Sequence, residues 1–492
     1  MTSTQSGLAT RTTIRLEANP SRVISRLFVP GQEGFEQQDT RAGAVLARIL
    51  ALDEDDVQSA LDDVVSRFDD RHRDLRGTFR AHAGELADRL NPDRELSVSR
   101  SLLLGATFTS EYAIEGAALC NPSMVVHPDQ SGIDSGSARF VMSVRGIGEG
   151  HLSSIGFRTG TVDAGGAVVV DDPGPFATVG TTEPAVLGAA GFRSELERFR
   201  DAGEAADYVL DALGDCFTRD ALDRRLARLH ANVITRGNAE ETIAVIRAVA
   251  DRTYAIRFPD DVPLPERVLW PATGAEAAGM EDARFVRFVD DDGAVTFYAT
   301  YTAYSGSKIG QQLLATADFQ HFTSVPLVGR AAANKGLALF PRRINGRFYA
   351  MSRSDRESNA VAFSDELSVW ADALPCQQPT EAWEVLQLGN CGAPIETDAG
   401  WLVLTHGVGP MRTYGIGAIL LDLDDPTKVL GRLRQPLLSP TAGERDGYVP
   451  NVVYSCGALV HGDWLVLPYG ISDGAIGIAT VSVTRLVAAL LG

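Results

Sequence analysis

The segment Trp464-Leu-Val-Leu-Pro-Tyr-Gly470 nearly repeats Trp401-Leu-Val-Leu-Thr-His-Gly407, which begins 63 residues earlier in the chain. Three further segments share this pattern of a short apolar strand that ends in a polar residue: RFVMSVR (139–145), TFYATYTA (296–303) and RFYAMSR (347–353). Apart from one longer interval, the copies recur about every 50 to 60 residues, which is typical of the blades of a β-propeller. The sequence therefore predicts a mainly β fold, a five-bladed β-propeller.

The ends of the repeated strands are the first place to look for a site. If each copy is the inner strand of one blade, the strand ends converge on the axial channel, where propellers hold their ligands. The polar residues expected there are Arg145, Thr302, Arg353, His406 and Tyr469. Such convergence predicts an active site in the channel.

The composition excludes several classes of function. The 492 residues carry a net charge of −19, which repels nucleic-acid phosphates and anionic lipid. The N-terminal MTSTQSGLATRTT lacks the apolar core of a signal peptide, and no run approaches the roughly 20 apolar residues of a membrane span. Five scattered cysteines without a CxxC pair argue against a disulfide framework or a structural zinc site. We therefore expect a cytoplasmic protein without nucleic-acid or membrane partners.

The pattern of apolar residues changes twice along the chain. Apolar residues at helical spacing before about residue 100 predict an N-terminal helical accessory region over 1–100. Short β-rich runs then predict a propeller domain over 101–492. A second amphipathic stretch predicts a helical insertion at about 190–255, which accounts for the longer interval between the first two repeats.

Two groups of charged residues are candidates for chemistry. The segment GMEDAR (279–284) places two carboxylates and a guanidinium just before a strand, although a turn with a surface ion pair has the same composition. Arg353 and His406 fall at repeated strand ends, and Lys335 lies upstream of Arg353. Such side chains from neighbouring blades suit an anion that needs several charge-assisted donors, such as phosphate. Each of them also has a structural reading, as a solvated charge or a buried hydrogen-bond donor.

Three other motifs are rejected. The segment GIGEGH (146–151) follows a strand but precedes no helix, so it is not a dinucleotide-binding loop. His127 and Asp129 lack a third ligand, and no metal site is predicted. Serine hydrolase chemistry is disfavoured because the chain has no G-x-S-x-G elbow.

The motifs taken together resemble glycoside hydrolase family 130, the β-mannoside phosphorylases and related β-1,2-mannosidases. The resemblance covers roughly residues 121–481, with its motifs in the same order along the chain. They are Asn121-Pro122, SVRGIGEGHLSSI (143–155), GMEDARF (279–285), YTAY (301–304), ALFPRRINGRFYAMSR (338–353), GAPIETDAGWLVLTHGV (392–408), ILLDLDDPTKVLGR (419–432) and NVVYSCGALVHGDWLVLPYGISD (451–473). The family fold is a five-bladed β-propeller, so the resemblance implies the same architecture.

The resemblance also implies an inverting mechanism. Asp282 matches the acid of the family's Glu-Asp-Pro-Arg motif, with Ala283 here in place of the proline, and would protonate the glycosidic oxygen through a sugar hydroxyl. Phosphate, held by Arg353, His406 and Lys335, would attack the anomeric carbon from the opposite face and give α-mannose 1-phosphate. The implied reaction needs no cofactor, because inorganic phosphate is the co-substrate.

Further positions match residues that hold the mannosyl unit. These are Asn121, Arg145 and Asp473, together with the aromatic Tyr304. The implied substrates are manno-oligosaccharides, and the expected linkage is β-1,2. The helical additions, which are atypical of compact members, would shape the acceptor site or form a homodimer interface.

Departures from the family pattern leave two alternatives open. Glu396 stands where many phosphorylases have a lysine, and Thr405 where a tyrosine often precedes the histidine. Hydrolytic members supply a carboxylate base for water, and Glu357 or Glu396 would play that part in an inverting β-1,2-mannosidase. A non-catalytic carbohydrate-binding propeller is the second alternative, and it predicts that Asp282 faces solvent.

Overall fold

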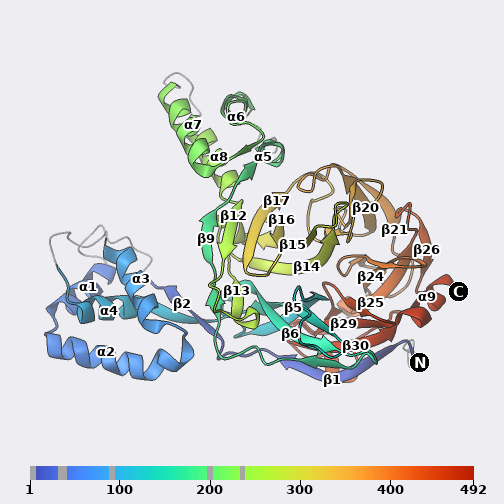
Figure 1. Ribbon diagram of the computed structural model, residues 1–492, viewed down its shortest axis with the longest axis horizontal. Coiled ribbons are helices and arrows are strands. Elements are labelled where there is room, and N and C mark those ends of the chain that lie inside the picture. The colour runs from blue at the N-terminus through green and yellow to red at the C-terminus, as the bar shows by residue number, and fades with distance from the viewer. Residues whose placement is uncertain (1–6, 31–40, 88–94, 197–202, 233–238) are drawn as a thin grey trace. The chain divides into compact units, whose positions relative to one another are not determined.

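The computed structural model describes residues 7–30, 41–87, 95–196, 203–232 and 239–492 (Figure 1). The chain divides into two compact units. The helical unit comprises Asn19–Gly116 with Gly174–Thr178, and the β unit comprises Met1–Ala18, Ala117–Pro173 and Val179–Gly492. Each unit is built around hydrophobic clusters of its own, and every predicted site residue lies in the β unit.

The helical unit packs four helices beside a two-stranded sheet. Its elements are β2 (Val23–Leu27), α1 (Arg41–Ala51), α2 (Glu54–Phe68), α3 (Leu75–Ala87), α4 (Val98–Thr107) and β3 (Thr109–Ala113). Asp53 and Ser97 cap the N-termini of α2 and α4 through their side-chain oxygens. Helix α4 buries Leu102, Leu103 and Leu104, and a side chain at Gly105 would collide with the Phe79 carbonyl of α3. The close approach of these two helices therefore requires glycine.

The β unit consists of antiparallel groups of strands that follow one another along the chain (Figure 1). The first contains β4 (Ala118–Val126), β5 (Ala138–Ile147), β6 (Ser153–Val162), β7 (Val168–Val170) and β13 (Arg267–Leu269). The second contains β14 (Gly279–Val289), β15 (Val295–Tyr304), β16 (Ile309–Thr316), β17 (His321–Leu327), β12 (Tyr254–Arg257) and β9 (Thr181–Pro184), and it joins the first through one parallel pair between β6 and β14.

Three more groups complete the β unit. They are β18 (Ala338–Leu339) with β19 (Phe348–Ser352), β20 (Asn359–Ser364) and β21 (Ala373–Gln377); β22 (Gln387–Asn390) and β23 (Ile395–Thr397) with β24 (Gly400–Val408), β25 (Tyr414–Leu421) and β26 (Val429–Arg432); and β27 (Val453–Tyr454) and β28 (Leu459–His461) with β29 (Trp464–Ile471), β30 (Ala475–Ser482) and β1 (Ala9–Glu17). The mainly β prediction is confirmed.

The repeated segments form β5, β15, β19, β24 and β29, each with a paired strand on both sides. The prediction that they are the inner edge strands of their sheets is therefore wrong. A strand that is paired on both edges and covered on both faces is almost uniformly apolar, which makes it the clearest repeat in the sequence. The strands that precede them in each group, such as β4 and β14, are irregular because they contain bulges.

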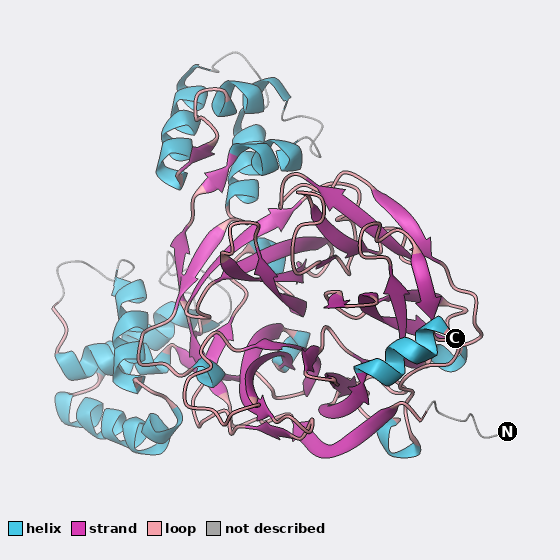
Figure 2. Ribbon diagram, turned by 45° about the vertical axis from the view of Figure 1, so that its right-hand side comes forward, coloured by secondary structure: helices cyan, strands magenta, loops and turns pink. Residues whose placement is uncertain are grey.

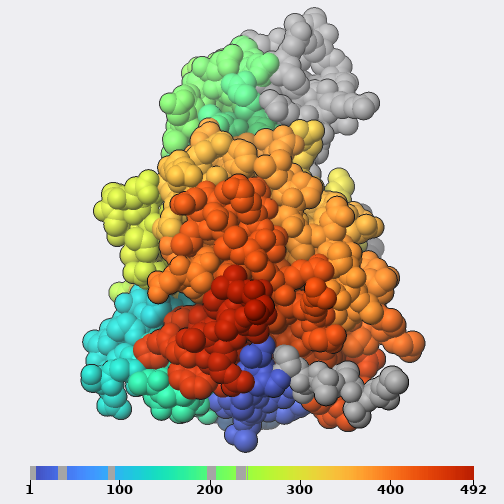
Figure 3. Space-filling model, turned by 90° about the vertical axis from the view of Figure 1, so that its right-hand side faces the viewer, coloured from blue at the N-terminus to red at the C-terminus, as the bar shows by residue number. Residues whose placement is uncertain are grey.

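The N-terminal segment corrects the prediction of a helical region over 1–100. Residues Ala9–Glu17 form β1, which pairs antiparallel with β30 near the C-terminus. Figure 3 shows this blue segment beside the red C-terminal strands. The alternation of Ile14 and Leu16, which pack inward, with exposed polar neighbours is a strand pattern, and it precedes the helical spacing that begins further along.

Helices α5 (Ala189–Leu196), α6 (Gly203–Leu210), α7 (Arg219–Asn232) and α8 (Ala239–Ala250) are inserted between β9 and β12, together with β10 (Leu187–Gly188) and β11 (Cys216–Phe217). Figures 1 and 2 show these helices as a group at one end of β9 and β12. Their buried residues form a separate core that includes Phe192, Leu222 and Ile246. The insertion therefore packs largely on itself.

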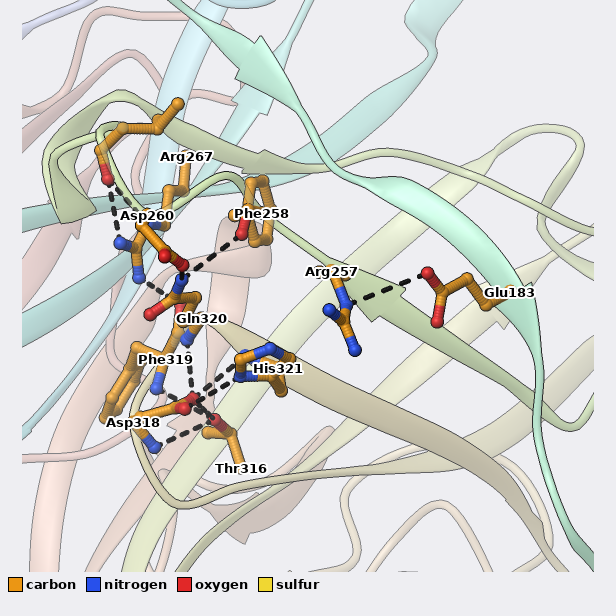
Figure 4. Close-up of polar contacts among 11 residues, drawn as sticks. Glu183, Arg257, Phe258, Asp260, Arg267, Thr316, Asp318, Phe319, Gln320 and His321 are labelled. Carbon is orange, nitrogen blue, oxygen red and sulfur yellow. Dashed lines mark hydrogen bonds and ion pairs between the residues drawn. The ribbon is translucent and has the colours of Figure 1, made fainter.

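Polar contacts fix the chain where it returns from the insertion (Figure 4). Arg267 donates to the carbonyls of Val262 and Phe319, at 2.8 to 3.0 Å. Asp318 accepts from the backbone nitrogens of Gln320 and His321, both at 2.8 Å, and so closes the turn between β16 and β17.

Within the described part of the chain, no helix combines the length and apolar character needed to cross a membrane.

Candidate active site

Two matching bulges place a pair of side chains face to face. The register of β4 shifts between Cys120 and Ser123, and that of β14 shifts between Glu281 and Arg284. Inside these bulges, Asn121 (φ 49°) and Asp282 (φ 57°) adopt left-handed backbone conformations. The Asn121 Nδ2 donates a hydrogen bond to Asp282 Oδ1, and both residues are buried. Bulges redirect side chains out of a sheet, which explains how residues 161 positions apart meet here.

Cations surround the two carboxylates of β14. Arg145, near the end of β5, contacts Asp282 through Nη1 at 3.3 Å and Glu281 through Nη2 at 2.7 Å. Lys335 donates to the other oxygen of Glu281. Burial of Asp282 opposes its ionisation, but Arg145 and Lys335 outweigh it and lower the pKa of Asp282 to about 2. Asp282 is therefore ionised at neutral pH in this arrangement.

Arg353 and His406 form the second part of the site. His406 Nδ1 lies 3.1 Å from the Asn390 carbonyl, and Nε2 lies 3.1 Å from Arg353 Nη1. Because a carbonyl only accepts and a guanidinium only donates, the proton of His406 must be on Nδ1 and Nε2 must be an acceptor. Burial, with the charges of Arg353 and Arg284, lowers the pKa of His406 well below its ordinary value, so the imidazole is neutral.

Gly389 makes room for this pair. A methyl group added at Gly389 would lie 2.6 Å from His406 Cε1 and 2.7 Å from Arg353 Cδ. These distances are far below van der Waals contact, so only glycine at this position of β22 allows His406 and Arg353 to meet.

Arg284 joins the two parts of the site. Its Nη1 donates to the Asp282 carbonyl at 3.2 Å, and its Nη2 donates to the Tyr454 hydroxyl at 2.8 Å. The Tyr454 ring in turn packs edge-on against His406, with ring centroids 4.9 Å apart. On the other side, a methyl group added at Gly336, the residue after Lys335, would lie 3.7 Å from Arg353 Cβ, so the two segments lie side by side. We call this closed set of contacts the site network: Asn121, Arg145, Glu281, Asp282, Arg284, Lys335, Arg353, His406 and Tyr454.

Several polar atoms of the site network are buried and have no hydrogen-bond partner among the residues that the structure describes. They are Asn121 Oδ1, Arg145 Nε, Arg284 Nε and Arg353 Nε, and Thr302 Oγ1 and Asn390 Oδ1 lie on the adjoining strands. Buried polar groups are rarely left unpaired in proteins, and exceptions concentrate at functional sites. A polar ligand with several acceptors and donors suits this arrangement.

Asp473 lies in a turn after β29 in which Ser472 and Asp473 both have left-handed backbones, with φ of 47° and 50°. Burial and the nearby charge of Asp282 raise the pKa of Asp473 to about 6, although Arg145 and Arg412 act in the opposite direction. The site thus holds one carboxyl group that is readily ionised and one that is readily protonated. Such divergence is common where acid–base chemistry occurs.

We expect Asp473→Asn to stabilise the protein at neutral pH. Because the pKa of Asp473 is raised from 3.8 to about 6 on folding, ionisation of this carboxylate opposes the folded state, and its cost develops as the pH rises from about 4 to about 6. The variant should gain up to about 3 kcal/mol in unfolding free energy above pH 7 and little below pH 4. Denaturant unfolding at pH 4 and pH 7.5 measures this, with the exposed Asp365→Asn as a control. A gain that does not depend on pH would contradict the assignment.

The remaining predicted residues lie in different places. Tyr304 ends β15, and its hydroxyl donates to the Gly306 carbonyl of its own turn at 2.8 Å. The Glu357 side chain is exposed. Glu396 is held by two hydrogen bonds from Arg342 and lines a groove of about 490 Å³ with Arg287. Since Glu396 pairs with Trp401, which is five residues before His406 on β24, or roughly 16 Å at strand spacing, Glu396 is not brought to the site network.

Two of the five repeated strand ends have no contact within the site network through their side chains, among the residues that the structure describes. The Tyr469 hydroxyl donates to Glu444 at 2.7 Å, and Glu444 is paired with Arg11 of β1. Thr302 pairs with Glu281 in the sheet, and its hydroxyl is buried. Of the five, only Arg145, Arg353 and His406 belong to the site network, because the repeated strands are second in their sheets and alternate side chains point to opposite faces.

Sequence reasoning gave no role to Glu281, Arg284 or Tyr454, although GMEDAR was singled out as a candidate. Regular alternation along β14 would place Glu281 and Arg284 on opposite faces of the sheet. The bulge between them turns both side chains toward the site, and the sequence pattern does not reveal this bulge. Tyr454 lies in the two-residue strand β27, which carries no periodic signal. The pairing of Asn121-Pro122 with Asp282-Ala283 at equivalent bulges is the sequence feature that could have located the first part of the site.

The sequence of this chain is similar to those of several known proteins. Residues 237–490 match the sequence model of glycoside hydrolase family 130, which is described as beta-1,4-mannooligosaccharide phosphorylase. A 1,2-beta-oligomannan phosphorylase of Thermoanaerobacter sp. is 36% identical over 220 residues, which span 44% of this chain and 72% of the relative. A beta-1,2-mannobiose phosphorylase of Listeria innocua is 33% identical over 226 residues, 44% of this chain and 62% of the relative.

A solved structure is also similar to this chain. The beta-1,2-mannobiose phosphorylase from Listeria innocua in complex with beta-1,2-mannobiose superposes with a TM-score of 0.44 and 22% sequence identity, covering 77% of this chain and 93% of that chain. The superposition is too loose to transfer individual residue positions.

Proposed function

The chain belongs to glycoside hydrolase family 130, and we propose that it is an inverting phosphorylase of β-mannosides, with β-1,2-linked manno-oligosaccharides as its substrates. Inorganic phosphate attacks the anomeric carbon, the glycosidic bond breaks, and the products are α-mannose 1-phosphate and a sugar shortened by one unit. The proposed architecture is a five-bladed propeller, with β5, β15, β19, β24 and β29 as the second strand of each blade.

The observation that carries this proposal is the single site network that joins Asp282 to a group of cations. An inverting hydrolase needs two carboxylates about 6.5 to 9.5 Å apart, whereas a phosphorylase needs one acid and a site for phosphate. Arg284 donates to the Asp282 carbonyl, and Lys335 binds the neighbouring Glu281. Arg353 is connected to Arg284 through His406 and Tyr454, so all three supply positive charge to one network. The two alternative bases are placed otherwise, since Glu357 is exposed and Glu396 is bound to Arg342.

Asp282 must gain a proton before it can act as the acid. In the present contacts Arg145 and Lys335 keep the pKa of Asp282 low. Entry of a phosphate anion beside Lys335 and Arg353 adds negative charge, and a nearby like charge raises the pKa of a carboxyl group. Phosphate binding therefore favours protonation of Asp282, while the mannosyl unit takes over the hydrogen bonds of Asn121 and Arg145. The proton then passes to the glycosidic oxygen, directly or through a sugar hydroxyl.

In this proposal His406 acts on phosphate mainly through Arg353. Because Nε2 accepts from Arg353, it fixes the direction of the guanidinium. A hydrogenphosphate ion can also donate its own P–O–H proton to Nε2, whereas the neutral ring cannot donate to phosphate from that nitrogen.

We expect His406→Gln and His406→Asn to differ in phosphate use. The glutamine oxygen reaches the position of Nε2 and keeps an acceptor for Arg353, whereas asparagine reaches only the position of Nδ1. His406→Asn should raise the KM for phosphate about 10-fold or more, because a hydrogen bond to a charged group contributes about 1.5 to 3 kcal/mol. His406→Gln should raise it less than about threefold, and the KM for the sugar should change little in both. Equal effects of the two variants on both substrates would contradict this role.

The linkage is tested with a panel of substrates. The protein is incubated in phosphate with β-1,2-mannobiose, β-1,2-mannotriose and β-1,4-mannobiose, and the sugar phosphate is followed by NMR, which reports its anomeric configuration. The proposal predicts α-mannose 1-phosphate, formed fastest from the β-1,2-linked sugars. A β-configured product, or preference for the β-1,4 linkage, would contradict the corresponding part of the proposal.

A further inference from the structure

Two turns of the β unit have the same sequence pattern and the same backbone. One is Gly146-Ile-Gly-Glu-Gly-His-Leu152, after Arg145, and the other is Gly407-Val-Gly-Pro-Met-Arg-Thr413, after His406. Gly148 and Gly409 have φ and ψ of −115°, −154° and −110°, −163°, and each donates its backbone N–H to the carbonyl four residues later, at 3.1 and 3.0 Å. Both turns thus extend directly from a strand end that supplies a side chain to the site network.

The equivalent positions His151 and Arg412 end these turns in left-handed conformations, with φ of 67° and 53°. Met411, which precedes Arg412, is also left-handed (φ 57°) and is 87% exposed, so its side chain gains little from burial. A left-handed backbone is unfavourable for side chains with a Cβ, and such conformations concentrate at binding and active sites. The backbone of the turn containing Arg412 is therefore strained, and burial of the Met411 side chain does not offset this strain.

Both turns reach the surroundings of Asp473 from different sides. His151 is hydrogen-bonded to the Tyr448 hydroxyl, with ring centroids 5.1 Å apart. Tyr448 flanks the Asp473 turn, because a methyl group added at Gly474 would lie 3.7 Å from its backbone nitrogen and Val449 donates to the Ser472 carbonyl at 2.9 Å.

Arg412 approaches from the other turn. Its guanidinium lies 5.9 Å from the centre of the Tyr414 ring, which stacks on His406 at 6.1 Å. The charge of Arg412 is also felt by Asp473, whose pKa it lowers in part. Within the described chain, no carboxylate lies within ion-pair distance of Arg412.

From this geometry, and resting on the proposed function, we propose that His151, Tyr448 and Arg412 form a rim that binds the sugar unit attached to the reacting mannosyl unit. We call these three residues the two-turn rim. Tyr448 flanks the turn of Asp473, which the family resemblance assigns to the mannosyl unit, and Arg412 lies over Tyr414 beside His406. We therefore place the two-turn rim one sugar further out. A guanidinium presents two parallel donors that suit neighbouring hydroxyl groups, and the exposed ring of Tyr448 suits the C–H face of a sugar. The two-turn rim would therefore select the acceptor sugar.

Binding rather than turnover tests this proposal. Titration calorimetry without phosphate measures the Kd of β-1,2-mannobiose for the wild type, Arg412→Ala, Tyr448→Ala and the control Arg330→Ala, which alters an exposed arginine paired with Asp372. We expect a rise in Kd of about 10- to 100-fold for Arg412→Ala and about threefold to tenfold for Tyr448→Ala, with none for the control. The Kd of inorganic phosphate, measured separately, should stay within twofold in all variants.

Each outcome separates the two proposals. Mannobiose binding that Arg412→Ala and Tyr448→Ala leave within twofold of the wild type would overturn the rim, even if the wild type forms sugar phosphate. Equal losses of mannobiose and phosphate binding would also overturn it, because they indicate general damage to the site. If the rim variants weaken mannobiose binding but the wild type forms no sugar phosphate, the rim stands as a sugar-binding surface and the phosphorylase proposal fails.

Discussion

Asp282→Asn is expected to lower the rate of sugar phosphate formation by a factor of about 10² to 10⁴, the usual contribution of general acid catalysis. Asparagine keeps the shape of the side chain and can still contact Asn121 and Arg145, but it carries no transferable proton. The left-handed backbone at position 282 also tolerates asparagine well. The loss should therefore appear in kcat, with the KM values changed far less. Steady-state kinetics with β-1,2-mannobiose and phosphate measures this.

Asp290→Asn is the matched control for this experiment. Asp290 follows the other end of β14 and pairs with Arg343 near the surface. We expect Asp290→Asn to retain the wild-type kcat and KM values. That result would show that removing a carboxylate next to β14 does not affect the kinetics when the carboxylate lies outside the site network. If Asp282→Asn keeps most of the wild-type kcat, Asp282 is not the acid, and Asp473 becomes the next carboxyl group to examine.

The second large effect is expected from Glu281→Ala, which should lower the unfolding free energy by about 3 kcal/mol and abolish activity. Glu281 is buried and pairs with both Arg145 and Lys335. Its removal leaves Arg145 in a buried position with one carboxylate fewer, and breaking one partner of a buried ion pair typically costs about 3 to 5 kcal/mol. Lys335 then loses its carboxylate partner and is no longer held where the proposed function uses it to bind phosphate. Urea unfolding and phosphorolysis assays measure the two effects.

A double-mutant cycle identifies the cause. Glu281→Ala combined with Arg145→Met removes both charges, so it should recover at least about half of the stability lost by Glu281→Ala alone, while activity stays absent. Glu357→Ala, which removes an exposed carboxylate, should change stability by less than about 0.5 kcal/mol. Strictly additive effects of Glu281→Ala and Arg145→Met would show that the ion pair does not couple these residues.

The fold was predictable where the sequence repeats. The repeats around Val403 and Val466 can be recognised in the sequence because each of these residues is buried on a strand that is paired on both edges. The role of β1 was not predictable, because its partner β30 lies more than 450 residues away and nothing local marks that pairing. Strand existence is a local property, whereas sheet order depends on tertiary contacts.

The site was predictable in its residue types but not in its connections. The sequence singled out Asp282, Arg145, Arg353 and His406, and the structure brings them into one network. That His406 accepts from Arg353 depends on the Asn390 carbonyl at its other nitrogen, which no sequence pattern reveals. The roles of Glu281 and Arg284 arise from the bulge between them, since alternation alone would place successive side chains on opposite faces.

The central claim is that phosphate, rather than water, is the nucleophile at this site. The most direct measurement is a paired reaction of the wild type with β-1,2-mannobiose in H₂¹⁸O, with and without inorganic phosphate, in which mannose 1-phosphate, free mannose and their ¹⁸O content are quantified. The account predicts unlabelled mannose 1-phosphate and one equivalent of unlabelled mannose with phosphate, after correction for spontaneous exchange, and no cleavage without it. Cleavage without phosphate that releases only mannose, half of it carrying ¹⁸O at the anomeric carbon, would contradict the account and identify the protein as a hydrolase.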